Sequence, residues 1–403
     1  MAFSRLTRRF LLLASCLLSL LPIPARGQST LSLTWHGEVR PRFESREPVE
    51  GAWRSFTSMR TRLELDVIME EGLRLFFQPQ DVRVWGGETS ERDRSADNLD
   101  VHQAFLDVVD VPGIGGFVRV GRQEVALAEA RLIAAPDWGQ AGQSFDGARW
   151  VRSAGRHRLE VLVIQVAESA TPTHDHEARL YGASWSGDAG AWGRFDAYVL
   201  RDQVDGAVEH GQNLVGGVWN LTLAPLAFRA QGILESGTRG GRDVDAFLLA
   251  GRARLALAQG RGQVALGYDY LSGDPEPEDG VTRVFSTLFG ARHRYYGRAD
   301  YFADIPFHTA GLGLQDLALK MAWRPEPDLG VNLDLHAFRT AVQGPAAEQR
   351  MGEEMDLWLR YRLREHLDLE GGLSLARAGP VMEALGRLQG TGTFAYVMTS
   401  VWF

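Results

Sequence analysis

The chain has 403 residues, a formal net charge of −8, 45% hydrophobic residues and a single cysteine, Cys16. Because this cysteine lies near the N-terminus, the rest of the chain can form neither a disulfide framework nor a thiolate metal site. The acidic total argues against a nucleic-acid partner. No later stretch holds 18 uncharged apolar residues, which excludes a membrane-spanning helix after the N-terminus.

Residues 1–27 are predicted to form a secretory signal peptide. Three arginines precede an apolar segment, residues 10–21, that is too short to span a membrane, and Ala25-Arg26-Gly27 supplies small residues for cleavage before Gln28. One alternative is a lipoprotein site at residues 13–16, which is disfavoured because the apolar segment continues past Cys16. The other is a twin-arginine signal at residues 7–11. Removing residues 1–27 takes away four arginines and leaves 39 basic against 51 acidic residues.

The rest of the chain alternates between apolar and polar residues with period two. In residues 59–69, apolar side chains such as Leu63 and Leu65 alternate with charged side chains such as Arg60 and Arg62. The same pattern recurs in residues 331–337, 356–363 and 367–375. Such alternation is typical of strands with one apolar and one polar face.

We expect about eighteen such strands. They are predicted near residues 31–47, 56–69, 72–84, 99–109, 115–126, 143–152, 156–167, 177–186, 191–203, 212–224, 225–236, 246–258, 261–273, 312–323, 328–341, 354–363, 366–377 and 393–403. Short turns such as 70–72 and 364–366 alternate with long polar segments such as 86–98, 124–142 and 273–311. Two rims of unequal loop length are typical of outer-membrane barrels.

The last predicted strand, TFAYVMTSVWF, ends the chain on Phe403, with Val401, Val397 and Ala395 on the same face. A terminal aromatic residue on an alternating strand resembles the signal that the outer-membrane insertion machinery recognises. The 45 glycines and 11 tryptophans also suit closed sheets with aromatic girdles. We therefore predict an all-β fold, a transmembrane antiparallel up-and-down barrel in one domain, residues 28–403. A periplasmic β-propeller or β-helix is the alternative, but no repeat of suitable period is present.

Four short motifs follow one another within about thirty residues. They are Gly121-Arg122-Gln123, Arg131-Leu132, Asp137-Trp138 and Phe145-Asp146-Gly147. Their order resembles the alginate-export family of bacterial outer-membrane barrels, as do QAFLD at residues 103–107, LYG at 180–182 and FSTLFGARHRYYGRADYF at 285–302. One departure is AEA at residues 128–130, where the family often has a Tyr-Gly pair. The resemblance implies an outer-membrane channel for an alginate-like polysaccharide, assisted by a periplasmic secretion scaffold.

Arginine recurs on the polar faces of the predicted strands and in the motif loops, which predicts an arginine-lined pore. The candidate pore residues are Arg60, Arg62, Arg122, Arg131, Asp146, Arg149, Arg292, Arg294, Arg298, Arg360 and Arg362. A guanidinium presents a planar fork that suits carboxylates, so such a pore would select anions, either a uronate polymer or small anionic solutes. The alternative is that arginines and acids in a polar lumen only satisfy one another.

The sequence gives little support for an enzyme. It contains no nucleophile elbow, no phosphate-binding glycine loop and no His-Glu-x-x-His motif, so we assign no catalytic residue, no metal and no cofactor. His174-Asp175-His176 could bind a metal adventitiously, although a solvated turn explains it equally. The alternatives to an export channel are therefore an anion-selective nutrient porin and, less favoured, a barrel enzyme with a Ser/His or acidic pair at one rim.

Overall fold

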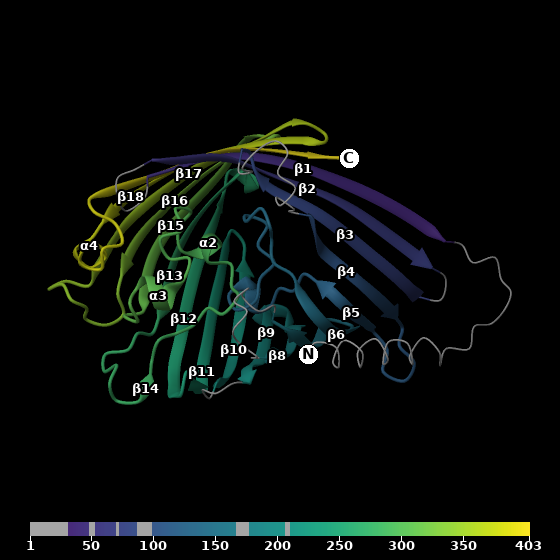
Figure 1. The fold of residues 1–403 in the computed structure, drawn as a ribbon, viewed down its shortest axis with the longest axis horizontal. Coiled ribbons are helices and arrows are strands. Elements are labelled where there is room, and N and C mark those ends of the chain that lie inside the picture. Colours follow the sequence, from purple (N-terminus) through teal and green to yellow (C-terminus); the bar gives the residue numbers. More distant parts are fainter. Residues whose placement is uncertain (1–30, 48–52, 70–71, 87–98, 167–176, 206–209) are drawn as a thin grey trace.

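A computed structural model describes residues 31–47, 53–69, 72–86, 99–166, 177–205 and 210–403. The predicted signal peptide and the His174-Asp175-His176 turn lie outside these residues. Long tilted strands form the wall of the molecule, and the strands at the two ends of the described chain lie side by side (Figure 1).

The strands occupy nearly the predicted positions. They are β1 (Ser32–Arg46), β2 (Arg54–Met69), β3 (Leu73–Val84), β4 (Leu99–Val109), β5 (Phe117–Gln123), β6 (Phe145–Ala154), β7 (His157–Gln165), β8 (Glu177–Asp188), β9 (Arg194–Asp205), β10 (His210–Leu223), β11 (Leu226–Arg239), β12 (Arg242–Leu257), β13 (Gly262–Leu271), β14 (Val281–Thr282), β15 (Leu314–Glu326), β16 (Leu329–Arg339), β17 (Arg350–Arg364), β18 (Leu367–Ala378) and β19 (Thr391–Trp402). Eighteen form the wall, and β14 is a two-residue strand that pairs in parallel with β12.

The wall is a closed antiparallel barrel. Each wall strand pairs with the next along the chain, and β1 pairs with both β2 and β19. At the seam, the Gly37 N–H donates to the Phe403 carbonyl at 2.8 Å, and the Phe403 N–H donates to the Gly37 carbonyl at 3.1 Å. The prediction of an up-and-down barrel of about eighteen strands is confirmed, and the C-terminal residue takes part in its closure.

The two rims differ as the sequence predicted. Most turns at the rim that holds the start of β1 and the end of β19 are short, as between β6 and β7 or between β17 and β18. The opposite rim carries the long connections, including those between β5 and β6, between β13 and β15 and between β18 and β19. In outer-membrane barrels the short-turn rim faces the periplasm and the long-loop rim faces the outside.

Side chains alternate between lipid and lumen along each strand. On β17, Leu357 and Leu359 are exposed on the outer face, whereas their neighbour Asp356 is buried inside the barrel. A barrel in a membrane turns its apolar face outward, so the exposed leucines form the surface expected against lipid.

Part of the inner wall is apolar and is covered by a loop. Apolar inward side chains of β7 to β12, among them Leu162, Leu180 and Leu214, are buried in one cluster with Leu132 and Ile133 of the β5–β6 loop. This cluster is the hydrophobic core of the molecule. The loop, which contains the short 3₁₀ helix Ala128–Ala130, therefore occupies one side of the lumen and leaves a polar passage on the other.

Candidate functional site

The β5–β6 loop, residues 124–144, is fixed to the arginine-rich wall of β1 and β2 through Asp137. The Asp137 carboxylate lies 2.8 Å from the Arg40 guanidinium, 2.8 Å from that of Arg60 and 3.9 Å from that of Arg62. Arg40 and Arg60 are almost completely buried, whereas the Asp137 side chain is 70% exposed to the passage. The single Asp137 carboxylate therefore interacts with three arginines of the wall.

Amide groups complete the attachment of this loop. The Arg40 Nε–H donates to the Gln140 Oε1 at 3.0 Å, and the Gln140 Nε2–H donates back to the Arg40 carbonyl at 3.2 Å. On the next strands, the Arg62 Nε–H donates to Gln80, whose amide in turn donates to the Ala141 carbonyl at 2.9 Å. Buried guanidinium groups whose donors are used in this way hold the loop in one position.

The protonation of Asp137 follows from its surroundings. Enclosure inside the barrel raises the pKa of the Asp137 carboxyl, but the charges of Arg40 and Arg60 and the hydrogen bond from Arg60 outweigh it and lower the pKa below its ordinary value. Asp137 is therefore ionised at neutral pH and keeps its contact with the two buried arginines.

The loop between β13 and β15 also folds into the lumen. It contains the short helices α2 (Arg292–Tyr295) and α3 (Ile305–His308). The Ala299 N–H donates to the Glu354 Oε1 at 2.8 Å, and the Arg298 N–H donates to the Asp356 Oδ2 at 3.2 Å. Two buried carboxylates of β17 thus hold the backbone of this loop against the wall.

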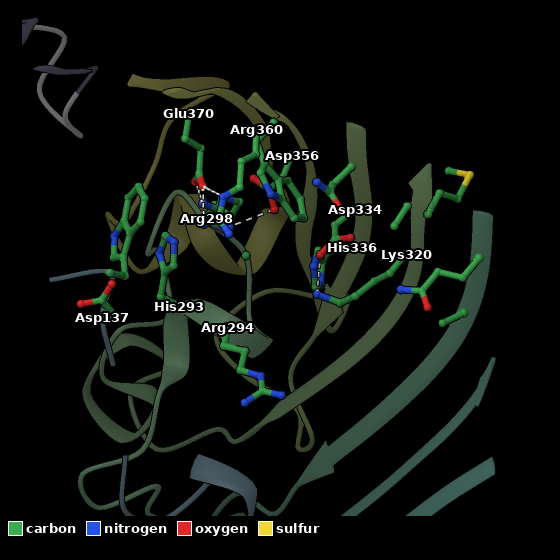
Figure 2. A pocket seen from close by; sticks show the side chains of 18 of the residues that line it. Asp137, His293, Arg294, Arg298, Lys320, Asp334, His336, Asp356, Arg360 and Glu370 are labelled. Carbon is green, nitrogen blue, oxygen red and sulfur yellow. Dashed lines mark hydrogen bonds and ion pairs between the residues drawn. The ribbon is translucent and has the colours of Figure 1, made fainter. Parts of the chain in front are cut away.

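Arg298 combines charge contacts and aromatic ring contacts in the passage. Its guanidinium donates to the Glu370 carboxylate at 3.2 Å and to the Tyr396 hydroxyl at 2.7 Å. It also lies 4.4 Å from the ring centroid of Trp358 and 5.0 Å from that of Trp138. Figure 2 shows Arg298 between Glu370, Arg360 and Asp356. Charge and ring contacts together fix this guanidinium in one orientation.

The two inward loops meet in the middle of the barrel. The Trp138 and His293 rings stack at 4.1 Å with an interplanar angle of 10°, and the Phe289 N–H donates to the Leu132 carbonyl at 2.9 Å. Burial lowers the pKa of His293, although a 2.7 Å contact with Asp300 partly opposes this. A neutral His293 can stack on Trp138 without adding charge to the passage.

Beside these loops lies a cavity of about 540 Å³. Its lining brings together seven basic side chains with the carboxylates of Asp137, Asp334, Asp356 and Glu370. The basic side chains are Arg40, Arg252, Arg254, Arg294, Arg298, Lys320 and Arg360. In Figure 2, Arg294 extends away from the carboxylates and Lys320 lies towards Asp334. Cations therefore outnumber carboxylates around this cavity.

Three of the lining arginines are not neutralised. Within the part of the chain that the structure describes, no carboxylate lies within ion-pair distance of Arg252, Arg254 or Arg294. The cavity adjoins two others, of about 640 and 610 Å³, that share Arg360 as a lining residue and lie towards the short-turn rim. Basic side chains outnumber carboxylates around the first two cavities, whereas five carboxylates and three arginines line the third.

The predicted pore residues divide into three groups. The first group anchors loops. Arg60 and Arg62 are buried and bind the β5–β6 loop, and the buried Arg131 pairs with Asp269 at 2.5 Å. The half-buried Arg292 donates to the Thr287 hydroxyl and the Leu288 carbonyl.

The second group faces the passage. Arg298, Arg294 and Arg360 line the cavity, and Arg360 and Arg362 bind Glu370 at 2.8 Å and Asp368 at 3.0 Å. Most of these side chains are paired with acids, as the alternative interpretation of the sequence described.

The third group lies away from the passage. Arg149 points inward from β6 and lies 3.7 Å from Glu160 of β7, outside the three cavities described above. Arg122 and Asp146 pair with each other at 3.2 Å. They are an odd number of residues from the inward Arg119 and Arg149 on the same strands, so they lie on the outer face of the sheet.

The pore residues predicted from the sequence do not include Arg252, Arg254 or Lys320, which line the cavity. Arg252 and Arg254 alternate with Ala253 and Leu255 in a predicted strand, the same pattern that singled out Arg60 and Arg62. The alternation that identifies inward arginines was therefore present in the sequence of β12. What the pattern could not reveal is which inward arginines have a carboxylate partner, because the partners come from neighbouring strands, as for Arg360, and from distant loops, as for Arg40.

In the described residues no three His, Cys, Asp or Glu side chains are grouped as metal ligands would be. None of the helices in the described ranges is long and apolar enough to cross a membrane.

A family model described as "Alginate export" matches residues 32–391. Among curated proteins, none matches the chain significantly. Solved structures with the same fold include three Pseudomonas aeruginosa proteins. OccK3 (OpdO) has a TM-score of 0.64 at 15% identity, covering 92% of this chain and 96% of that one. OpdL has a TM-score of 0.65 at 12% identity, with 92% and 99% covered. OpdK, solved with vanillate, has a TM-score of 0.62 at 12% identity, with 92% and 98% covered.

Proposed function

This chain belongs to the alginate-export family of outer-membrane β-barrels, and from that premise we propose that it passes an anionic, alginate-like polysaccharide through an arginine-lined lumen. The observation that carries the proposal is the set of unneutralised cations, Arg252, Arg254 and Arg294, around the central cavity. A fixed positive charge beside a narrow aqueous path attracts anions and repels cations.

The chemistry of a uronate polymer fits this lining. Each sugar carries one carboxylate, and a guanidinium can bind a carboxylate through two parallel hydrogen bonds. Passage also requires that no single contact be too strong. Asp334, Asp356 and Glu370 lie among the cations and compete with the polymer for them. The lining therefore supports a series of weak contacts. We extend the proposal to a periplasmic scaffold partner at the short-turn rim.

Ion selectivity tests the proposal. At about 5 Å in a water-filled pore, one charge attracts an anion by about 0.8 kcal/mol, so its loss should lower the local anion concentration roughly fourfold. Arg252→Gln, Arg254→Gln and Arg294→Gln should each reduce the anion preference measured from reversal potentials across planar bilayers in a salt gradient. Replacing all three with glutamate should reverse it.

The matched control is Arg152→Gln, because Arg152 lies at the short-turn rim and donates to the Ile114 carbonyl outside the lumen. This variant should keep the parent's reversal potential. Cation preference in the parent channel would remove the physical basis of the anionic-polymer proposal and leave only family membership in its support.

A second candidate function is uptake or release of small anionic solutes. Two observations favour it: the inward loops divide the passage into cavities of about 540 to 640 Å³, a size typical of small-molecule sites, and the similar OpdK was solved with vanillate. The candidates differ in the expected block of ion current. A polymer channel should be blocked for longer as uronate oligomers lengthen, whereas a small-solute channel should respond to single uronates and not to long oligomers.

We propose no enzymatic activity. The most deeply buried His–acid contact in the described part of the lumen joins His336 Nδ1 to the Asp316 carboxylate at 2.9 Å. His336 also stacks on Phe338 at 5.3 Å. These contacts describe a packed structural pair.

A further inference from the structure

Three arginines gather on the outer face of the barrel at the long-loop rim. Arg339 ends β16, Arg350 begins β17 and Arg377 lies one residue from the end of β18. Their strand neighbours Phe338 and Ala376 point inward and are buried, so Arg339 and Arg377 point away from the lumen. We call Arg339, Arg350 and Arg377 the rim cluster.

The rim cluster lies at the edge of the apolar belt. Towards the middle of the barrel, the outer faces of the same strands and their neighbour β15 carry exposed large hydrophobic side chains. These are Leu317, Met355, Leu357, Leu373 and Leu375. A belt of this kind meets the acyl chains of the membrane, so the cluster just beyond it lies at the height of the lipid headgroups.

The charges of the rim cluster are only partly neutralised. Arg350 pairs with Glu353 at 3.1 Å and reaches Glu348 at 4.0 Å. In the described ranges no carboxylate lies within ion-pair distance of Arg339 or Arg377. Arg377 lies directly opposite Glu353 in the sheet, but that carboxylate is bound by Arg350.

Two of these cations face each other. Arg339 is the direct partner of Arg350 across the antiparallel β16–β17 pair. Like charges directly opposite each other on a sheet are destabilising. An anion placed between them would remove this repulsion, and a phosphate group can accept hydrogen bonds from several guanidinium groups at once. The sheet therefore presents a site that favours a bridging anion.

We propose that the rim cluster binds a phosphate of the phosphorylated glycolipid of the outer leaflet. The long-loop rim faces the outside in outer-membrane barrels, and the cluster lies where the headgroups of that leaflet meet the wall. Basic residues beside an apolar surface attract anionic headgroups. The site has no connection with the lumen, so this proposal and the proposed channel function can fail independently.

The proposal is tested by measuring how lipid A, the phosphorylated glycolipid meant here, binds to the full-length protein in detergent micelles. Native mass spectrometry would compare diphosphorylated lipid A with the same lipid after removal of both phosphates. We expect only the phosphorylated lipid to bind tightly. Arg339→Gln and Arg377→Gln should each weaken its binding by about fivefold, whereas Arg377→Lys, which keeps the charge, should retain most of it.

Arg152→Gln provides the control, because Arg152 is an exposed arginine at the opposite rim and its loss should leave binding unchanged. Folding of each variant is checked by its heat-sensitive migration in gels, and Arg377→Lys tests the charge dependence even if a glutamine variant folds poorly. Equal binding of the dephosphorylated lipid, or undiminished binding by the double glutamine variant, would overturn the proposal. Displacement of lipid A by inorganic phosphate alone would mark a soluble-anion site and would overturn it as well.

Discussion

Replacing Asp137 with asparagine should loosen the β5–β6 loop and enlarge the polar passage. The substitution keeps the size of the side chain but removes the charge that Arg40 and Arg60 share at 2.8 Å. Both arginines are buried, so neither can recover the interaction through full hydration. The loop then depends on Gln140 and on backbone carbonyls for its attachment to β1.

The magnitude follows from what each arginine retains. Removing one partner of a fully buried ion pair costs about 3–5 kcal/mol. That figure is an upper bound here, because the Asp137 side chain is 70% exposed and Arg60 still binds Glu38 at 2.9 Å. Arg40 also keeps its bond to Gln140. We therefore expect a loss of about 1–2 kcal/mol in the free energy that holds the loop in place.

Single-channel recording in planar bilayers measures the effect. Asp137→Asn should show larger or more variable conductance than the parent and a stronger anion preference, because the passage gains one net positive charge. Asp279→Asn is the control, since Asp279 pairs with Arg283 at 2.8 Å in a different loop, and it should behave as the parent does. Identical conductance and selectivity in Asp137→Asn and the parent would refute the loop-anchor reasoning.

The remaining predictions concern pH, lipid contact and assembly. Because the pKa of Asp137 is lowered in the folded protein, its stabilising contribution is present above the ordinary aspartate pKa near 4 and is lost as the pH falls through the lowered value. The noise of the parent channel should therefore rise only in that acid range. The noise of the Asp137→Asn channel should not change there, because asparagine does not titrate. Leu359→Arg on the lipid face should cost about 2–4 kcal/mol in unfolding experiments, and unchanged stability would contradict the register. Deleting Phe403, which bonds to Gly37 at the seam and packs edge-on against Trp35 at 5.9 Å, should reduce outer-membrane yield.

The barrel itself could be predicted because its signals are local. Alternation such as Leu357, Leu359 and Leu363 against Asp356 and Arg360 repeats along each strand, and period two directly encodes a wall with one lipid face. Turn length marked the two rims in the same way. These features require no knowledge of which strand lies beside which.

The filling of the lumen could not be predicted, because it depends on contacts between distant segments. Asp137 meets Arg40 across 97 positions of sequence, and Trp138 stacks on His293 from another loop. Whether an inward arginine is an anchor such as Arg60 or an unneutralised cation such as Arg252 is decided by these loops.

The motif residues illustrate the same limit. Arg122 and Asp146 mark the family resemblance in the sequence, yet the sheet places them on its outer face, since side chains one position apart on a strand point to opposite sides. The sequence by itself determined the wall and its two faces through a periodicity of adjacent residues. Only the tertiary structure decided which charges meet, because electrostatic pairing depends on distance in space and the loops carry carboxylates to arginines far away in the chain.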